Sequence, residues 1–406
     1  MANVTIQTGE WGATREWSSS MKSGPIWVSP LVGYFFYVDS SQQLVYRKST
    51  NGGQSWGSAV VVRTGDTWVN KFSVWYDRWT PGDSGTLIHL AYITESPDSI
   101  QYRTLDTSID SLSGETSIAA PLINTNASNA WGVACIDITK ARNGYLYVIF
   151  GTAGVGATGS YRSTNGGTSF DELANAVETE ADRWLLFPSA EADQQDIWCI
   201  YWDEDAEEIS LKVYDGSEDS WAETSISGSM IPLYSMTFMM SAVQRLSDNH
   251  VILIAQTSGG AADLKCWDIG GGGSITAKTD LYTNEANHLS CCLFINQQND
   301  ELYAAYNGDP GDTSVNSLHV RYKKSADGGA SWGAATIYNE GAEGRYQEVW
   351  TSMSVGDDGG RLEIAWPERD AGDALTNYVN SVEIKAAAVG AIFGVNRAQA
   401  ALVLEV

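Results

Sequence analysis

The chain has 406 residues, with 24 Lys and Arg against 50 Asp and Glu, and a formal net charge of −26. This charge argues against binding to nucleic acid or to anionic membrane surfaces, because phosphate groups are bound by Lys and Arg. Hydrophobic residues make up 43% of the chain, and its 16 Trp and 19 Tyr suit the half-buried surfaces of β-sheets. No apolar run approaches the roughly 18 residues of a membrane helix, and no basic and apolar leader follows Met1. We therefore expect no signal peptide, transmembrane segment or membrane insertion.

An apolar run recurs along the chain at intervals of 51 to 60 residues. The runs begin at Tyr34, Ile88, Leu146, Ile197, Val251, Leu302 and Leu362. One apolar segment precedes each run and two strand-like segments follow it, so each repeat contains four predicted strands. Repeats of this length are typical of propellers, in which radial repetition protects most strand edges. The sequence predicts an all-β, seven-bladed β-propeller of four-stranded antiparallel blades, or six blades plus a terminal β segment.

Three segments are expected along the chain. Residues 1–24 form an N-terminal arm, residues 25–390 the propeller, and residues 391–406 a C-terminal strand or tail. A ring of blades must be closed, and either residues 3–8 or residues 392–396 can supply the outer strand of the last blade. The tail ends in the apolar stretch 397–406. Because a free apolar edge strand aggregates, we expect this stretch to pair within the fold or with a partner.

The cysteines and the acidic stretches give no pattern typical of a metal site. Five cysteines, an odd number without regular spacing, lie in apolar runs and are expected to be buried free thiols: Cys135, Cys199, Cys266, Cys291 and Cys292. The acidic stretches 203–208 and 308–312 could bind Ca²⁺ weakly, since hard cations prefer oxygen ligands, or they could be solvated hairpin tips. We expect no cofactor.

One eight-residue string occurs at 49–56, 163–170 and 325–332. It suits a tight hairpin turn, because Asp or Asn can accept a bond from the backbone two residues on, Gly takes a positive φ, and Ser caps the loop. A closing aromatic then packs on the sheet. The residues that define the strings are Ser49, Asn51, Gly53 and Trp56, then Ser163, Asn165, Gly167 and Phe170, then Ser325, Asp327, Gly329 and Trp332.

The form Ser-x-Asp/Asn-x-Gly-x-x-Trp/Phe resembles the Asp-box, or BNR repeat, of sialidases and related β-propellers. This resemblance covers roughly residues 25–390 through repeats and turns. It implies a sialidase-like propeller in which each box is a structural turn between the third and fourth strands of a blade, away from the active site.

The resemblance also implies what a sialidase would need. Such enzymes use three arginines that clamp the substrate carboxylate, an Asp acid/base, and a Tyr nucleophile activated by a Glu. The first arginine belongs to a Phe/Tyr-Arg-Ile-Pro motif on the first inner strand, but the matching stretch 24–31 carries Trp27 and Val28. If the chain is an enzyme, the candidate catalytic residues are Arg183, Arg345 and Glu348. Salt bridges between loops and strands are the alternative role for these three residues.

A second pattern lies near the starts of the inner strands. Six repeats carry an aromatic residue or His there, with three cations close by: Trp68, Trp131, Trp184, Tyr234, His288 and Tyr346, with Lys71, Arg183 and Arg345. One such residue per blade would ring the axial mouth, where aromatic faces stack on sugars and polar groups orient a ligand. The alternative is that these rings plug or line the channel.

The leading functional interpretation is a non-catalytic, sialidase-like propeller that binds glycans or partner proteins. The end of the tail loosely resembles C-terminal strands of phage virion proteins, which implies a virion structural or receptor-binding component that contacts other virion proteins through its terminal strands. The localisation would then be the virion, and otherwise the cytoplasm. An exo-glycosidase of the sialidase type and a purely structural spacer or decoration protein are the alternatives.

Overall fold

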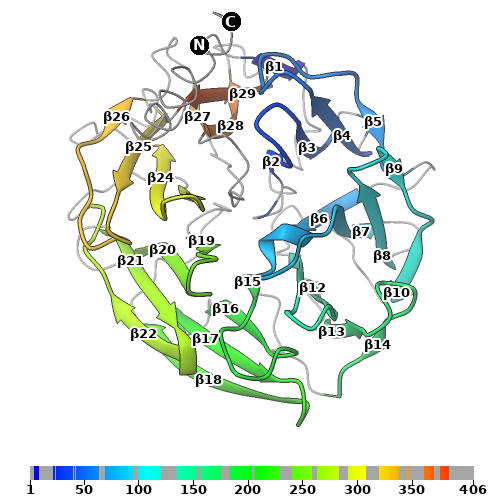
Figure 1. The fold of residues 1–406 in the computed structure, drawn as a ribbon, viewed down its shortest axis with the longest axis vertical. Helices are drawn as coiled ribbons and strands as arrows, with labels where there is room; N and C mark the ends of the chain where they lie inside the picture. The colour runs from blue at the N-terminus through cyan, green and yellow to red at the C-terminus, as the bar shows by residue number, and fades with distance from the viewer. Residues whose placement is uncertain are drawn as a thin grey trace, which may run out of the picture.

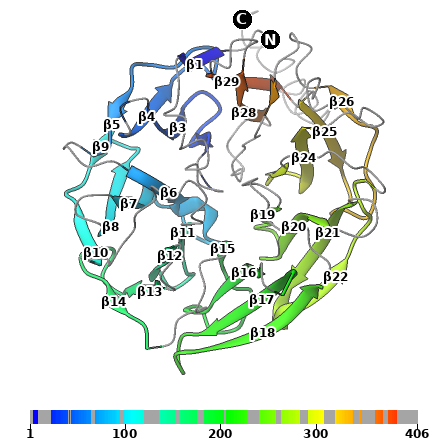
Figure 2. The same ribbon diagram turned by 180° about the vertical axis from the view of Figure 1, so that it is seen from behind.

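The computed structural model describes residues 4–8, 22, 24–39, 41, 43–63, 69–94, 99–119, 135–152, 157–174, 183–203, 206–228, 240–257, 263–282, 291–307, 320–337, 345–346, 361–369 and 375–383. The described strands form seven antiparallel sheets arranged around a central axis (Figures 1 and 2). The helical turns among these residues are the 3₁₀ segments η2 (Asp77–Trp79) and η3 (Gly271–Gly273). No helix within the described ranges is both long enough and apolar enough to span a bilayer.

Six sheets, here called blades 1 to 6, are each built from one continuous stretch of chain. Blades 1 to 3 comprise β2 (Ile26–Trp27), β3 (Gly33–Val38), β4 (Leu44–Ser49) and β5 (Val60–Val61); β6 (Val69–Tyr76), β7 (Leu87–Thr94), β8 (Ser99–Asp106), β9 (Ser111–Leu112) and β10 (Thr116–Ala119); and β11 (Cys135–Lys140), β12 (Leu146–Thr152), β13 (Ala157–Ser163) and β14 (Asp171–Glu172).

Blades 4 to 6 follow the same plan. They comprise β15 (Arg183–Pro188), β16 (Ile197–Asp203), β17 (Glu208–Asp215) and β18 (Ser220–Ser227); β19 (Met240–Gln244), β20 (Val251–Thr257), β21 (Asp263–Gly270) and β22 (Ser274–Ala277); and β23 (Cys291–Asn296), β24 (Glu301–Asn307), β25 (Val320–Ser325) and β26 (Thr336–Ile337).

The seventh sheet joins the two ends of the chain. It places β1 (Val4–Thr8) beside β29 (Leu375–Glu383), followed by β28 (Arg361–Arg369) and β27 (Arg345–Tyr346). Val4 lies opposite Val379 and Thr8 opposite Thr376, so the N-terminal strand is the outer strand of this sheet. The all-β propeller of antiparallel sheets is therefore confirmed. Six blades and this additional sheet of terminal segments match the predicted alternative of six blades plus a terminal β segment.

The predicted apolar runs coincide with the second strand of each sheet. All residues of β20 and all but the last residue of β16 are buried. Blades pack against both faces of these strands, so their residues are apolar in succession, without the alternation of a half-exposed strand. The outer strands β5, β14 and β26 have only two residues each. The predicted tail at 391–406 and the alternative closing strand at 392–396 lie outside the described residues, so the predicted domain boundaries stay predictions.

The three eight-residue strings form turns of one geometry, and each connects the third and fourth strands of its blade. In the turn of blade 6, the Ser325 hydroxyl donates to Asp327 (2.8 Å) and accepts the Gly329 N–H (2.9 Å). Asp327 accepts the Ser331 N–H (2.9 Å) and hydroxyl (2.6 Å). The hydrogen bonds from Ser331, chiefly the one from its hydroxyl, lower the pKa of Asp327 to about 2.

The eight-residue turns of blades 3 and 6 also contact the preceding blade. A Cβ added to Gly167 would lie 2.2 Å from the ring of Tyr102 in blade 2, and the Phe170 ring contacts Tyr102 edge-on at 5.1 Å. In blade 6 the Trp332 indole N–H donates to the Thr279 carbonyl of blade 5 (3.0 Å). These turns therefore hold neighbouring blades together, in addition to closing their own hairpins.

A buried ion pair lies where the inner strands of blades 2, 3 and 4 meet. The Lys22 ammonium is 2.8 Å from the Asp137 carboxylate on β11, and the two side chains are 5% and 2% exposed. Asp137 also accepts bonds from the Ser73 hydroxyl on β6 (2.5 Å) and the Leu186 N–H on β15 (2.7 Å). The Lys22 ammonium lies over the rings of Trp75 and Phe187, 4.7 Å from each centroid. Because burial outweighs the attraction of Asp137, the pKa of Lys22 is lowered.

Replacing Lys22 by Met tests how much this ion pair contributes. The change would leave a buried, uncompensated carboxylate, and we expect it to destabilise the fold by about 3–5 kcal/mol. Adding Asp137→Asn should restore part of the loss. As a control, Lys48→Met breaks the exposed pair with Asp110 (2.5 Å), and should cost at most about 1 kcal/mol. Thermal and urea unfolding measure both, and equal losses for Lys22→Met and Lys48→Met would contradict the central role of Lys22.

The Asp327 turn allows a second test, because Asn occupies the same position in the other two turns. Asp327→Asn should retain the bonds to Ser325 and Ser331 and keep the melting temperature at neutral pH close to that of the parent, whereas Asp327→Ala should lower it. Since the pKa of Asp327 is depressed to about 2, the contribution of its charge is present above its ordinary pKa and is lost as the pH falls towards 2. The Asn variant should lack this acid-dependent loss in thermal unfolding.

Candidate functional site

Two of the predicted cations lie near the starts of the inner strands of blades 2 and 4. Arg183 is the first residue of β15, and Lys71 lies near the start of β6. β11 lies between these strands and begins at Cys135. The positive charges of both cations act to lower the pKa of the Cys135 thiol. Burial raises the pKa of the Cys135 thiol to about 11, so this cysteine is not activated as a nucleophile. The structure thus brings Lys71 and Arg183 together around Cys135, at one end of the axis.

Trp184 follows Arg183 but points into the protein. Its side chain is fully buried and stacks on Tyr201 with ring centroids 6.4 Å apart. Its indole N–H donates to the Ile149 carbonyl of blade 3 (3.4 Å). In this conformation the ring packs between blades 3 and 4 and presents no face to a ligand.

The other predicted ligand residues cannot be placed in this way. Arg345 and Tyr346 form β27, at the inner edge of the closing sheet. The remaining candidates lie outside the described residues: Trp68, Trp131, Tyr234, His288 and Glu348. The ring of aromatic residues and the catalytic set therefore stay predictions.

The position where the resemblance expects an arginine is occupied by a packing residue. Trp27 on β2 is 3% exposed, and its ring contacts the ring of Trp56 at 5.9 Å. The turn aromatic and the residue at the arginine position thus stabilise each other, and no guanidinium is available there.

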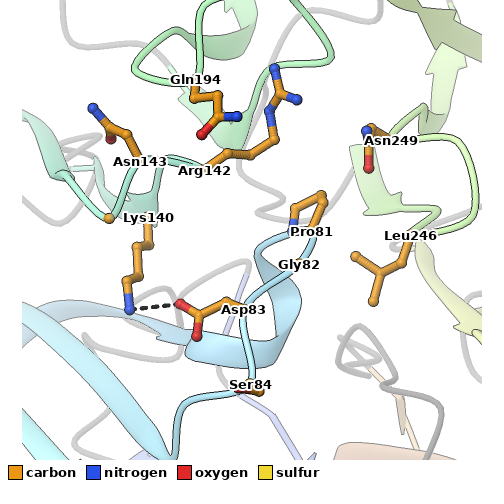
Figure 3. A pocket seen from close by; sticks show the side chains of 11 residues that line it. Pro81, Gly82, Asp83, Ser84, Lys140, Arg142, Asn143, Gln194, Leu246 and Asn249 are labelled. Atoms are coloured by element: carbon orange, nitrogen blue, oxygen red, sulfur yellow. Dashed lines mark ion pairs between the residues drawn. The ribbon is translucent and has the colours of Figure 1, made fainter.

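A pocket of about 670 Å³ opens at the other end of the inner strands (Figure 3). Its walls come from the hairpins that join the first and second strands of blades 2, 3, 4 and 5. They are residues 81–84, Lys140 with residues 142–144, Gln194, and Leu246 with Asn249. Since Leu146 at the start of β12 pairs with Ser163 at the end of β13, the eight-residue turns lie on this same face. The pocket thus lies at the opposite end of the inner strands from Lys71 and Arg183.

One wall of the pocket is held by a chain of charges. The Lys140 ammonium lies 2.7 Å from Asp83 and 2.5 Å from the buried Asp77. Asp77 also lies 2.9 Å from His89 Nε2 and accepts the Leu87 N–H (2.8 Å). Burial alone would raise the pKa of Asp77, but the bonds and charges of His89 and Lys140 outweigh it and hold this pKa well below its ordinary value.

The hairpins of blades 3 and 4 also bring amides and a guanidinium to the pocket. The Asn143 N–H donates to the Gln194 carbonyl (3.0 Å), which ties the hairpins of blades 3 and 4 together. Arg142 donates to the Glu191 carbonyl. Figure 3 shows the Arg142 guanidinium beside the Gln194 side chain, with Pro81 and Asn249 facing it from other blades.

Sequence reasoning did not single out these pocket residues. The local signals are the Pro81–Gly82 and Asn143–Gly144 dipeptides, which mark ordinary turns. Within the described ranges, no group of three or more His, Cys, Asp or Glu side chains is arranged to hold a metal ion. The stretch 308–312, expected to bind Ca²⁺ weakly, lies outside those ranges, and 203–208 lies only partly within them.

Comparison with known proteins relates this chain to solved structures through its fold. No family model matches, and no curated protein matches by sequence. A polysaccharide lyase of a new family, an ulvan lyase, is similar over 93% of this chain and 96% of its own, with 11% identity and a TM-score of 0.58. An arginine-to-alanine triple mutant of AofleA from Arthrobotrys oligospora is similar over 92% and 95%, with 10% identity and a TM-score of 0.50.

A sialidase structure is also similar in outline. NanB from Streptococcus pneumoniae aligns over 93% of this chain and 70% of its own, with 9% identity and a TM-score of 0.46. At these identities the similarity at TM-scores of 0.58 and 0.50 shows a shared propeller fold and leaves the function to be argued from the site.

Replacing Lys140 by Met tests the charged wall. The change removes a partner of a buried carboxylate and should cost about 1–3 kcal/mol at neutral pH. Because the pKa of Asp77 is held below its ordinary value of 3.8, its stabilisation is present above that pH and is lost as the pH falls further. The gap in melting temperature between parent and variant should therefore narrow between pH 6 and pH 2. A gap that stays constant over this range would show that Lys140 does not stabilise the charged form of Asp77.

Proposed function

We propose that this protein is a non-catalytic propeller that binds glycans in the pocket between the inner hairpins of blades 2 to 5. The observation that carries the proposal is the pocket itself, whose volume of about 670 Å³ is in the range of small-ligand sites. Hairpins from four blades converge on it, so a ligand there is held by elements fixed in the core. Amide groups of Asn143, Gln194 and Asn249 line it, and amides can both donate to and accept from sugar hydroxyls.

The lining supports binding rather than hydrolysis. Among its described residues, Asp83 is the sole carboxylate, and it is paired with Lys140 at 2.7 Å. Most glycoside hydrolases need two carboxyl groups flanking the scissile bond, and sialidases need a Tyr nucleophile. The described lining offers neither arrangement. In blade 1, Trp27 occupies the place of the first clamp arginine.

Fold similarity also supports a carbohydrate ligand, although less strongly than the pocket does. The ulvan lyase that shares this fold at a TM-score of 0.58 is described as a polysaccharide lyase. A propeller of this shape is thus compatible with a carbohydrate partner, although fold alone does not assign one.

A glycan array tests the proposal, with one variant that fills the pocket and one that does not. Gln194→Trp places a large ring in the pocket while keeping the backbone carbonyl that accepts the Asn143 N–H. Ile109→Trp is the control, because Ile109 is 70% exposed in the turn before β9. We expect glycan binding by the parent and by Ile109→Trp, and at least about tenfold weaker binding by Gln194→Trp. Undiminished binding by Gln194→Trp would refute the pocket as the site.

A fluorogenic glycoside screen covers the exo-glycosidase alternative. The proposal expects no turnover. Turnover that is abolished by Arg183→Ala would instead assign catalysis to the end of the axis where Lys71 and Arg183 flank Cys135.

A further inference from the structure

The two cations of the pocket wall differ in how their charge is neutralised. The Lys140 ammonium contacts two carboxylates, Asp83 at 2.7 Å and Asp77 at 2.5 Å. Its charge is therefore already balanced within the protein. Other described arginines near carboxylates are balanced as well, such as Arg245, which lies 2.6 Å from Asp248 and 3.3 Å from Asp268.

Arg142 has no such partner within the described ranges. Its guanidinium donates to a neutral acceptor, the backbone carbonyl of Glu191. Its Nε is buried and finds no acceptor among the described residues. Asp193 is affected by the Arg142 charge, but no described carboxylate lies within ion-pair distance of it. Among the described residues the Arg142 guanidinium therefore has no ion pair, although the chain has 50 acidic residues against 24 Lys and Arg.

The surroundings of Arg142 would strengthen its bond to an anion. The residue is half-buried in the pocket wall, and a charge pair is stronger where water is partly excluded. Guanidinium offers a planar fork that matches the oxygens of carboxylate or sulfate, and such charge-assisted bonds are roughly twice as strong as neutral ones. The amides of Gln194 and Asn249, which come from the hairpins of blades 4 and 5 (Figure 3), are neutral, so among the described lining residues they add no negative charge to balance the guanidinium.

We propose that the pocket selects acidic glycans, and that Arg142 binds their carboxylate or sulfate group. The proposal rests on the glycan-binding function proposed above and adds the class of ligand. The amides of Gln194 and Asn249 bind neighbouring hydroxyls of the glycan. The charge of Lys140 is already balanced by Asp83 and Asp77, so this residue holds the pocket wall in place and does not attract the anion.

Isothermal titration calorimetry with matched saccharides tests the ligand class. The probes are a galacturonic acid trisaccharide, its methyl ester, a sulfated galactose oligosaccharide and its desulfated form. The parent protein should bind at least one acidic probe about 10- to 100-fold more tightly than its neutral match, in line with the gain from a charge-assisted bond. The acidic probe that binds more tightly distinguishes a carboxylate from a sulfate ligand.

Variants of Arg142 assign that preference to the residue. Arg142→Gln should remove the preference for the acidic probe over its neutral match, and thermal unfolding of the same variant shows whether the protein is still folded. Arg142→Lys should keep part of it, since the charge remains but the fork is lost. The matched control is Arg47→Gln on β4, because Arg47 also donates to a backbone carbonyl, that of Gly57 (2.9 Å), and lies in blade 1. This control should bind like the parent.

Each outcome decides between the two proposals. Equal binding of acidic and neutral probes by the parent overturns the acidic-glycan inference and leaves the glycan-binding function standing. A preference for acidic probes that survives Arg142→Gln overturns the role of Arg142. If no saccharide binds the parent protein, both the proposed function and the inference fall.

Discussion

The ion pair between Lys22 and Asp137 is the contact on which the centre of the molecule depends. The Asp137 carboxylate contacts the Lys22 ammonium of the N-terminal arm, and it accepts hydrogen bonds from a hydroxyl on β6 and a backbone N–H on β15. Three inner strands and the arm are therefore fixed to a single buried group, which would be costly to leave unpaired. The pair lies between the two ends of the inner strands. The cations around Cys135 lie at one end, and the pocket lies at the other.

The fold could be predicted because its determinants are local and repeated. The apolar runs recur because each second strand is covered by blades on both faces, and the turns recur because Ser49, Ser163 and Ser325 each satisfy the same backbone N–H groups. Such chemistry leaves a pattern that can be read residue by residue. The sequence offered residues 3–8 and 392–396 as closing strands without deciding between them, since the pairing of β1 with β29 depends on the ring as a whole.

The candidate site could not be predicted for the opposite reason. Arg142, Gln194 and Asn249 come from three hairpins, each of which reads as an ordinary turn. Arg142 combines a position in the pocket wall with the absence of an ion pair among the described residues, and both depend on where other chain segments lie. Trp184 also shows what could not be predicted from the sequence. Its position in the repeat was correctly placed at the start of an inner strand, but the repeat does not specify whether the ring turns to the axis or to Tyr201.

The closing sheet affects how this protein unfolds. In an open stack of repeats, the terminal repeats are covered on one side only, and unfolding can start there. Here the first and last described strands, β1 and β29, lie side by side, so the ring has no terminal repeat to fray. Loss of any blade exposes two neighbours at once. The propeller should therefore unfold as a unit, with the barrier set by its weakest junction rather than by its ends.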